Sequence, residues 1–213
     1  FYNTAKSIPG IEIRPSNKVT EVIVKDGKVA GVKVIGKDKK EYTIDSKAVV
    51  LATGGFGANA KMIESLRPEY KGFATTNHPG ALGEGIDLGL RAGATLVDMR
   101  EIQAHPTVVP VKGILISESM RGRGAYLVNQ DGKRFINELL PRDIVAAGVL
   151  AQPTGKAWIL IDNALVQKNK LAQGYIQQGL AVKGNNVEEL AKGIGVPAAN
   201  LKATMEQLSL IHI

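Results

Sequence analysis

The chain has 213 residues, 44% of them hydrophobic, and a net charge of +7. This length allows one large domain or two small ones. The absence of cysteine excludes disulfides and thiolate metal sites within these residues, and no apolar run approaches the length of a membrane span. The lysines are scattered and aromatic residues are few, which argues against nucleic acid and favours a small anionic ligand.

The chain opens with FYNTAKSIPG, which has neither an initiator Met nor the layout of a signal peptide. We therefore expect it to begin inside a domain or after a processing step, and its localisation cannot be read from it. A β-meander is predicted next. Asp26-Gly27 separates two alternating apolar runs, Val19 to Val24 and Val29 to Ile35, which predicts a hairpin, and Tyr42 to Ile44 supplies a third strand.

A glycine-rich turn follows the meander. The run Ala48 to Ala52 (AVVLA) predicts a strand buried on both faces, Thr53 to Gly57 (TGGFG) a turn, and Asn59 to Leu66 a helix. This order is typical of an α/β nucleotide site, in which glycines allow a ligand to approach the backbone. A plain strand-to-helix turn is the alternative, because no complete GxGxxG fingerprint is present. A pyrophosphate-binding half would then lie upstream of Phe1.

A second glycine turn opens a helix predicted at Gly83 to Ala94. Its free amides would suit a phosphate or a polarised flavin carbonyl, and a surface helix that tolerates glycine is the alternative. A short strand is expected at Thr95 to Met99, and the composition changes near Arg100, where we place a domain boundary.

The stretch from Gln103 to Asp143 carries the densest chemistry. It interleaves charged residues with glycines and with short strands such as Ile114 to Ile116 and Ala125 to Val128, the latter followed by a turn, NQDG. Pro141 marks a helix start, so Arg142 lies in a first turn where a cation opposes the helix dipole and needs an anionic partner or a task. The charged residues are His105, Glu118, Arg121, Arg123, Arg134, Glu138 and Arg142.

The residues after Asp143 are expected to pack the core, and we assign them no functional role. We expect a buried strand at Ala157 to Asp162 and helices at Asn163 to Gln167, Val187 to Gly193 and Pro197 to Gln207. The final residues, LSLIHI, are expected to be a non-native tail spanning 208–213, in which His212 carries no information.

An ordered set of motifs resembles the fumarate reductase flavoproteins of the flavocytochrome c type, which are soluble relatives of the succinate dehydrogenase flavoprotein. The motifs are, in order, VVLATGGFG, GEG, AHPTV, ILISESMRGRGAYLVNQDGKRFINE and a further Arg before a helix. The likeness runs from about Ile11 to Gln207. It implies an α/β plus α+β fold: residues 1–99 as the C-terminal part of a Rossmann-like FAD-binding domain that includes the meander, and residues 100–207 as an α+β capping domain that clamps substrate.

The resemblance also implies a set of site residues and no metal. FAD would be bound by the Val19 backbone, Thr53, Gly54, Gly55 and Glu84, the last in place of a shorter acid. Substrate would be bound by His105, Ser117 and Glu118. Arg142 would be the acid catalyst, fed with protons by Glu118 and Arg121, and the family's remaining substrate His and Arg are expected beyond Gln207. Burial and neighbouring cations are expected to favour proton loss from Arg142.

The resulting prediction is a reductase of activated C=C bonds that turns fumarate into succinate by hydride transfer from FAD and protonation by an arginine. His105 favours a dicarboxylate. The alternatives are another acrylate (urocanate, methacrylate or a cinnamate type), a succinate dehydrogenase or aspartate oxidase relative, or a fragment inactive alone. An electron donor carrying haem, FMN or NADH would lie outside this chain, and the resemblance implies a periplasmic or cytoplasmic location.

Some site residues have ordinary alternatives. A histidine before proline, as at His105, is often a turn residue whose ring bonds the backbone. Glu118 and Arg121 have the spacing of a simple helical ion pair, and Glu138 is a structural partner for Arg142.

Overall fold

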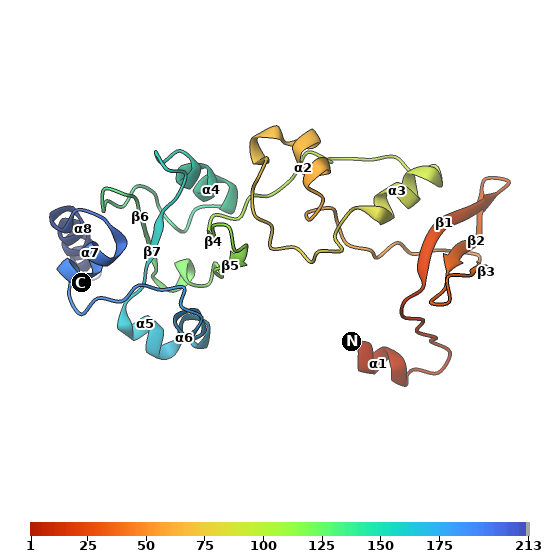
Figure 1. The fold of residues 1–213 in the computed structure, drawn as a ribbon, viewed down its shortest axis with the longest axis horizontal. Helices are drawn as coiled ribbons and strands as arrows, with labels where there is room; N and C mark the ends of the chain where they lie inside the picture. Colours follow the sequence, from red (N-terminus) through yellow and green to blue (C-terminus); the bar gives the residue numbers. More distant parts are fainter. Residues whose placement is uncertain (212–213) are drawn as a thin grey trace. The chain divides into compact units, whose positions relative to one another are not determined.

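The computed structural model describes residues 1–211 and the side chains of residues 1–208, so His212 lies outside the described residues. The chain is mixed α/β, and its described strands form small antiparallel sheets (Figure 1). It divides into two compact units. Unit 1 is Phe1–Gly72 with Asn77–Glu101, and unit 2 is Phe73–Thr76 with Ile102–Ile213. No helix in the described part is long and apolar enough to cross a membrane.

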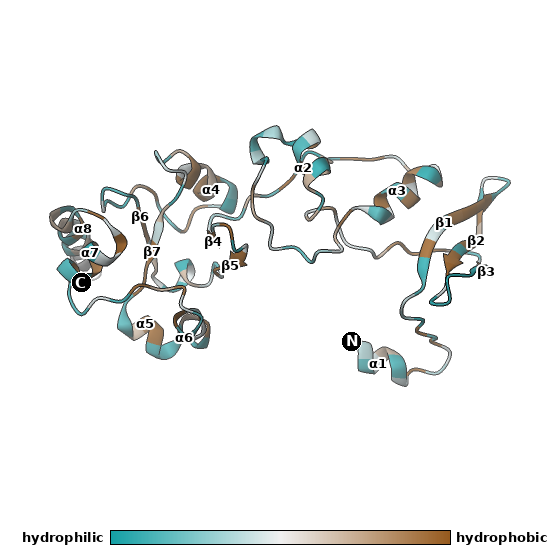
Figure 2. Ribbon diagram, in the orientation of Figure 1, coloured by the Kyte–Doolittle hydropathy of each residue, from teal (hydrophilic) through white to brown (hydrophobic). Residues whose placement is uncertain are grey.

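Unit 1 is built on a three-stranded antiparallel meander. Its strands are β1 (Lys18–Lys25), β2 (Lys28–Ile35) and β3 (Glu41–Asp45), in the order β1-β2-β3. Asp26 and Gly27 make the turn with φ of 50° and 73°, the left-handed geometry that matches the twist of a hairpin. Apolar residues concentrate in the strands and polar ones in the turn (Figure 2). The predicted meander is confirmed.

The sheet buries few residues, and only β3 alternates strictly between exposed and partly buried positions. Val22 of β1 and Val34 of β2 are buried. Gly31 in β2 has no space for a side chain, because an added Cβ would lie 2.2 Å from the carbonyl oxygen of Ile44 on β3. The helix α3 (Glu84–Arg91) contacts β1 and buries Leu88.

Three further helices lie in unit 1. The helix α2 (Ala60–Leu66) begins where predicted, with Asn59 Oδ1 accepting the backbone N–H of Met62 at 3.1 Å. A single 3-10 turn, η1 (Pro68–Tyr70), follows. The short α1 (Tyr2–Ser7) was not predicted; it buries no residue, so no apolar periodicity marks it.

Two predicted strands of unit 1 are absent. Residues 48–52 and 95–99 form no strand and pair with none in residues 1–211, and Asp98 has a left-handed φ of 56°. Val50 is 87% exposed and Val97 is 74% exposed, so the expectation that Ala48 to Ala52 is buried on both faces is wrong for this structure. A strand is stabilised by a neighbour that pairs its backbone groups, and an apolar run alone supplies none.

Unit 2 is organised around one antiparallel pair, β6 (Tyr126–Val128) and β7 (Trp158–Leu160). Successive residues of β6 face opposite ways, as the strand period requires. Leu127 packs with Val145 and Val149 of the helix α4 (Arg142–Leu150), while Val128 belongs to a separate cluster with the C-terminal helices. The NQDG turn after β6 is present. The strand predicted after the turn is reduced to a single β-bridge between Val128 and Arg134.

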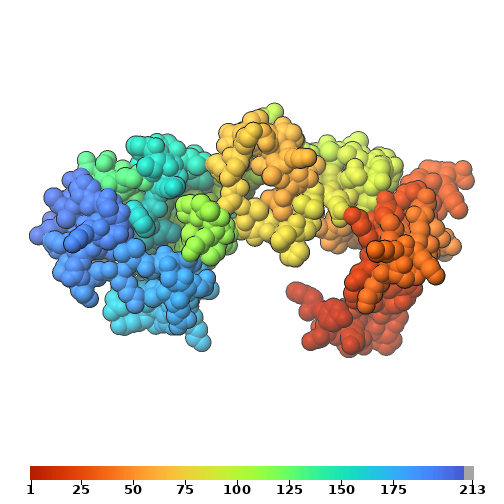
Figure 3. Space-filling model, viewed as in Figure 1, coloured from red at the N-terminus to blue at the C-terminus, as the bar shows by residue number. Residues whose placement is uncertain are grey.

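The helices after β7 cover this pair. They are α5 (Asn163–Lys168), α6 (Lys170–Gln177), α7 (Val187–Ile194) and α8 (Ala198–Ile211). The residues of α7 and α8 form one continuous surface in the space-filling view (Figure 3). The helix α6 was not predicted, because its apolar positions are interrupted by Gln173 and Gly174.

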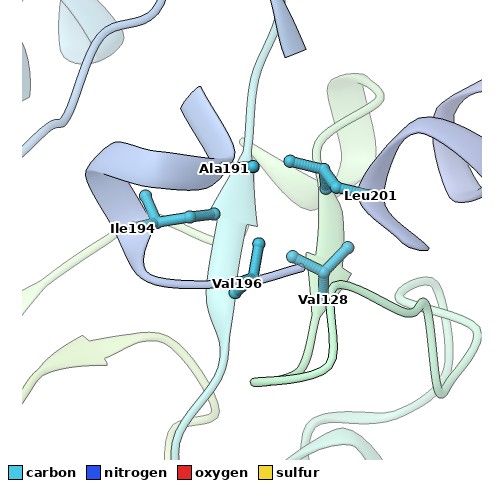
Figure 4. Packing of buried hydrophobic residues seen from close by; sticks show 5 residues of the cluster. All are labelled: Val128, Ala191, Ile194, Val196 and Leu201. Atoms are coloured by element: carbon cyan, nitrogen blue, oxygen red, sulfur yellow. The ribbon is translucent and has the colours of Figure 1, made fainter. Parts of the chain in front are cut away.

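The packing of α7 and α8 on β6 is the best-formed core of the unit. Leu201 reaches toward Ala191, and Val128, Ile194 and Val196 complete the same cluster (Figure 4). Leu208, within the segment expected to be a non-native tail, is also buried. The assignment of residues 208–213 as a tail remains a prediction.

Candidate functional site

A pocket of about 280 Å³ opens in unit 1 beside the meander. Three of the residues predicted to bind FAD, Val19, Thr53 and Glu84, line it. Its lining is Asn17, Lys18, Val19, Thr53, Gly80, Glu84 and Leu88. These residues come from β1 and the residue before it, from the TGGFG turn, from the loop before α3 and from α3, so the fold gathers distant segments around one cavity.

The two glycines after Thr53 border this region without lining the pocket. A Cβ added at Gly54 or Gly55 would meet no atom within 4 Å. The carbonyl oxygen of Gly55 accepts the backbone N–H of Gly83 at 3.2 Å, which fastens the start of α3 to the turn. At Gly85, an added Cβ would lie 1.9 Å from Thr53 Oγ1, so α3 and the turn touch without space for a methyl group.

Glu84 is the charged group of this pocket. Its carboxylate pairs with Lys18 Nζ at 2.6 Å, and both side chains are more than half exposed. An ion pair this exposed contributes little and separates readily. The carboxylate is therefore free to accept hydrogen bonds from ligand hydroxyls, while the first amides of α3 point out of a positive helix end. This donor and acceptor set fits the ribitol or pyrophosphate part of FAD.

In unit 2 the predicted substrate and catalytic residues gather around Glu118. Arg142 donates from Nε to Glu118 Oε2, and His105 Nε2 lies 4.0 Å from the same oxygen. Arg142 also donates from Nη1 to Gln103 Oε1 at 2.9 Å. Arg142 comes from the first turn of α4, as predicted, whereas the others come from loops around the hairpin β4 (Val108–Val109) and β5 (Ile114–Leu115).

The hairpin explains why residues 105 and 118 meet. Val108 pairs with Leu115 and Val109 with Ile114, so the residues before β4 and after β5 are brought together. Short strands at this site were predicted only for β5. Its partner β4 was missed because two valines between prolines give no periodic signal.

The ring of His105 has a defined orientation. Its Nδ1 accepts the backbone N–H of Thr107 at 3.3 Å. Because an amide N–H can only donate, Nδ1 carries the lone pair and the neutral ring carries its hydrogen on Nε2, the nitrogen that faces Glu118. Burial, followed by the charges of Arg142 and Arg121, lowers the pKa of His105, which favours this neutral form. The backbone bond is the one expected of an ordinary turn histidine, and it also leaves a donor aimed into the cluster.

The charges of the cluster shift one another. The hydrogen bond from Arg142 lowers the pKa of Glu118, and the same bond raises the pKa of Arg142. The expectation that the environment lowers the pKa of Arg142 is therefore wrong for this arrangement. Its side chain is 43% exposed, so burial does not offset the carboxylate.

Arg121 shows the behaviour that was expected of Arg142. It is 6% exposed, and burial lowers its pKa. Its Nη1 donates to the carbonyl oxygen of Glu138 at 2.5 Å, and its Nε is buried with no hydrogen-bond partner in the described residues. It makes no ion pair with Glu118, so the ordinary i, i+3 pair is not what holds it, although each feels the charge of the other.

Glu138 is not the partner of Arg142. It is buried and accepts from the Leu127 backbone N–H at 2.9 Å and from Arg134 at 2.8 Å. These bonds tie the segment after the NQDG turn to β6. The pair of Glu138 and Arg134 is thus a structural element, and it leaves Arg142 to Glu118.

Ser117 lies beside Glu118, partly buried. Its Oγ accepts the backbone N–H of Ser119 at 3.3 Å and shares a hydrogen bond with Ser119 Oγ at 3.0 Å. Its own backbone N–H donates to the Tyr175 hydroxyl at 2.9 Å. Gln103 and Tyr175 were missed as members of this neighbourhood: Gln103 sits two residues before His105, whereas Tyr175 has no local signal.

Comparison with known proteins agrees on one family. The model of the FAD binding domain matches residues 1–212. An NADH:fumarate oxidoreductase of Klebsiella pneumoniae is 44% identical over 92% of this chain and 21% of its own, and a probable fumarate reductase of Shewanella frigidimarina is 43% identical over 92% and 34%. The open conformation of a flavocytochrome c3 fumarate reductase matches with a TM-score of 0.72 and 41% identity over 97% of this chain and 36% of that one. The chain thus spans a fifth to about a third of the length of these relatives.

Proposed function

The chain belongs to the FAD binding domain family of the flavocytochrome c and fumarate reductase flavoproteins, and from this premise we propose that it is part of an FAD-dependent reductase that converts fumarate to succinate. The observation that carries the proposal is that Arg142 and His105 meet at the carboxylate of Glu118, which also feels the charge of Arg121 and follows Ser117 in the chain. Two cations and neutral donors around one acid suit a small dianion that must be both bound and protonated.

The proposed substrate contacts follow from the donors. The neutral ring of His105 presents Nε2–H, and the Ser117 hydroxyl can turn from Ser119 toward a carboxylate oxygen. Such contacts hold a substrate carboxylate and stabilise the charge that develops on it. Val19, Thr53, Glu84 and the neighbouring glycines of unit 1 would hold FAD, which when bound supplies the hydride.

The protein's own task is to deliver a proton. Arg142 holds its proton tightly while Glu118 is ionised. A proton arriving on Glu118 removes the negative charge that raises the pKa of Arg142, so loading the relay also makes Arg142 a stronger acid. Arg121, whose pKa is lowered by burial and whose charge acts on Glu118, would feed protons to Glu118. The proposed order is Arg121, Glu118, Arg142 and then the substrate carbon.

The proposal extends to the organisation of the whole protein. Residues 1–99 would be the C-terminal part of a Rossmann-like FAD-binding domain and residues 100–207 a capping domain. The electron donor, a haem, an FMN or NADH, would act from outside these residues. The names of the NADH-linked and flavocytochrome relatives support NADH and haem as the donors to test first.

The test is viologen-linked reduction of fumarate, urocanate and methacrylate by the full-length protein, in wild type, Arg142→Lys, His105→Ala and Arg123→Lys. Arg123 is an exposed arginine outside the cluster and serves as the matched control. We expect fumarate to be the preferred substrate, and turnover to fall by about 10²- to 10⁴-fold in Arg142→Lys with FAD still bound. Preference for another acrylate would refute fumarate as the substrate. Equal activity of Arg142→Lys and Arg123→Lys would refute Arg142 as the acid catalyst.

A further inference from the structure

One peptide group beside the cluster is held at both of its ends by side-chain hydroxyls. The carbonyl oxygen of Ile116 accepts from Thr107 Oγ1 at 2.7 Å. The amide N–H of the same peptide group, on Ser117, donates to the Tyr175 hydroxyl at 2.9 Å. We call these two bonds the hydroxyl bracket.

Thr107 connects the bracket to the other side of the cluster. It is 4% exposed, and its backbone N–H donates to His105 Nδ1 while its carbonyl oxygen accepts the Ile116 N–H at 2.9 Å. A single buried residue thereby orients the His105 ring and the residue before Ser117. Breaking its hydroxyl bond would leave the partly buried carbonyl oxygen of Ile116 without this partner, which is costly.

Tyr175 reaches the bracket from a different element. It lies on α6, and its ring packs on the cluster of Met120, Ala125 and Ala172. The start of α6 is itself fixed, since buried Asn169 accepts from the backbone N–H groups of the first helical turn. The hydroxyl of Tyr175 is therefore carried by a packed helix and not by a mobile loop.

We propose that Thr107 and Tyr175 are positioning residues of the substrate site, which act by fixing the plane of the peptide group between Ile116 and Ser117. The plane of a peptide sets the direction from which the next side chain leaves the backbone. Fixing it aims the Ser117 hydroxyl. A site held to within about 0.5 Å needs such support behind its contacting residues. This inference rests on the proposed function of Ser117.

The variants Thr107→Val and Tyr175→Phe each remove one hydroxyl from the full-length protein. Thr107→Ser keeps the hydroxyl and should restore wild-type behaviour. Thr204→Val is the matched control, because Thr204 is also buried in unit 2 and its hydroxyl donates to the Gly132 carbonyl oxygen at 2.9 Å, outside the cluster.

We expect KM for fumarate to rise about two- to tenfold in Thr107→Val and in Tyr175→Phe, the worth of one net hydrogen bond, with kcat changed less. In a Ser117→Ala background, Tyr175→Phe should have almost no further effect on KM, because the bracket acts through Ser117. Thr204→Val should keep the wild-type KM. Additive effects in the double variant, or an equal rise in KM in Thr204→Val, would overturn the proposal.

A second readout does not depend on the substrate. Hydrogen exchange of the Ser117 amide should be slow in wild type and at least fivefold faster in Tyr175→Phe. If the wild type does not reduce fumarate but this difference is found, the proposed function fails and the bracket stands. If exchange at Ser117 is the same in both proteins, the bracket is refuted whatever the substrate.

Discussion

The contact between α3 and the glycine turn permits a sharp test of the cofactor pocket. In Gly85→Ala the new Cβ would lie 1.9 Å from Thr53 Oγ1, 2.9 Å from its Cβ and 3.0 Å from its Cγ2. Rotating the Thr53 side chain moves only Oγ1 and Cγ2, so the backbone of α3 or of the turn must shift as well. Gly89→Ala, one turn later in the same helix, meets nothing closer than 3.6 Å and is the matched control.

The size of the effect can be worked from these contacts. Overpacking of this kind costs about 1–3 kcal/mol, and replacing a helical glycine by alanine returns about 0.4–1 kcal/mol. The net cost is about 1–2 kcal/mol. If this cost appears in the free energy of FAD binding, because the shift distorts the pocket, FAD affinity weakens by about 5- to 30-fold. Gly89→Ala should bind FAD as the wild type does and melt at the same or a slightly higher temperature.

The assay is titration of the deflavinated full-length protein with FAD, followed by the change in flavin fluorescence. Equal dissociation constants for Gly85→Ala and Gly89→Ala would show that the contact between Thr53 and α3 does not shape the cofactor site, and the assignment of this pocket to FAD would fall with it.

Three other outcomes follow from the structure. Arg142→Lys should lower fumarate turnover by about 10²- to 10⁴-fold with the flavin spectrum intact, and an unchanged rate would exclude Arg142 as the acid. The pKa of His105 is lowered from its ordinary value near 6.5, so the neutral ring contributes its full stability above about pH 6.5, and this contribution is lost as the pH falls through the lowered value. Wild type should therefore lose more of its thermal stability between pH 7.5 and 5.5 than His105→Gln does. Equal losses in the two proteins would contradict this. Leu201→Ala should destabilise the α7 and α8 packing by about 2–5 kcal/mol, seen as faster amide exchange in α7, whereas Met205→Ala, at a 39% exposed position of α8, should change it little.

Local signals in the sequence predicted local structure well. The hairpin turn at Asp26-Gly27 and the helix starts at Asn59 and Arg142 depend on residues within a few positions of one another, and the structure has all three. The ordered motif over residues 103–143 indicated the residues of the cluster in unit 2. The roles of its residues, and of the predicted FAD residues, stay predictions that the proposed experiments address.

The sequence does not show which of several nearby side chains each charged residue of the cluster pairs with. Glu138 is nearer to Arg142 along the chain than Glu118 is, yet the backbone N–H of Leu127 and the side chain of Arg134 occupy it. The choice of Glu118 reverses the expected shift in the pKa of Arg142. Tyr175 meets Ser117 across 58 residues, a pairing that depends on where α6 packs and on no local pattern.

The uncovered apolar runs at residues 48–52 and 95–99 have a practical consequence for anyone who handles these residues in isolation. A segment that pairs with no strand in residues 1–211 and exposes valines, here Val50 and Val97, is a template onto which another polypeptide can add a strand. Concentrating the isolated chain should therefore drive self-association through unit 1 into cross-β aggregates. Lysine placed at either valine would act as a gatekeeper against that fate, as charged residues do at the edges of natural sheets.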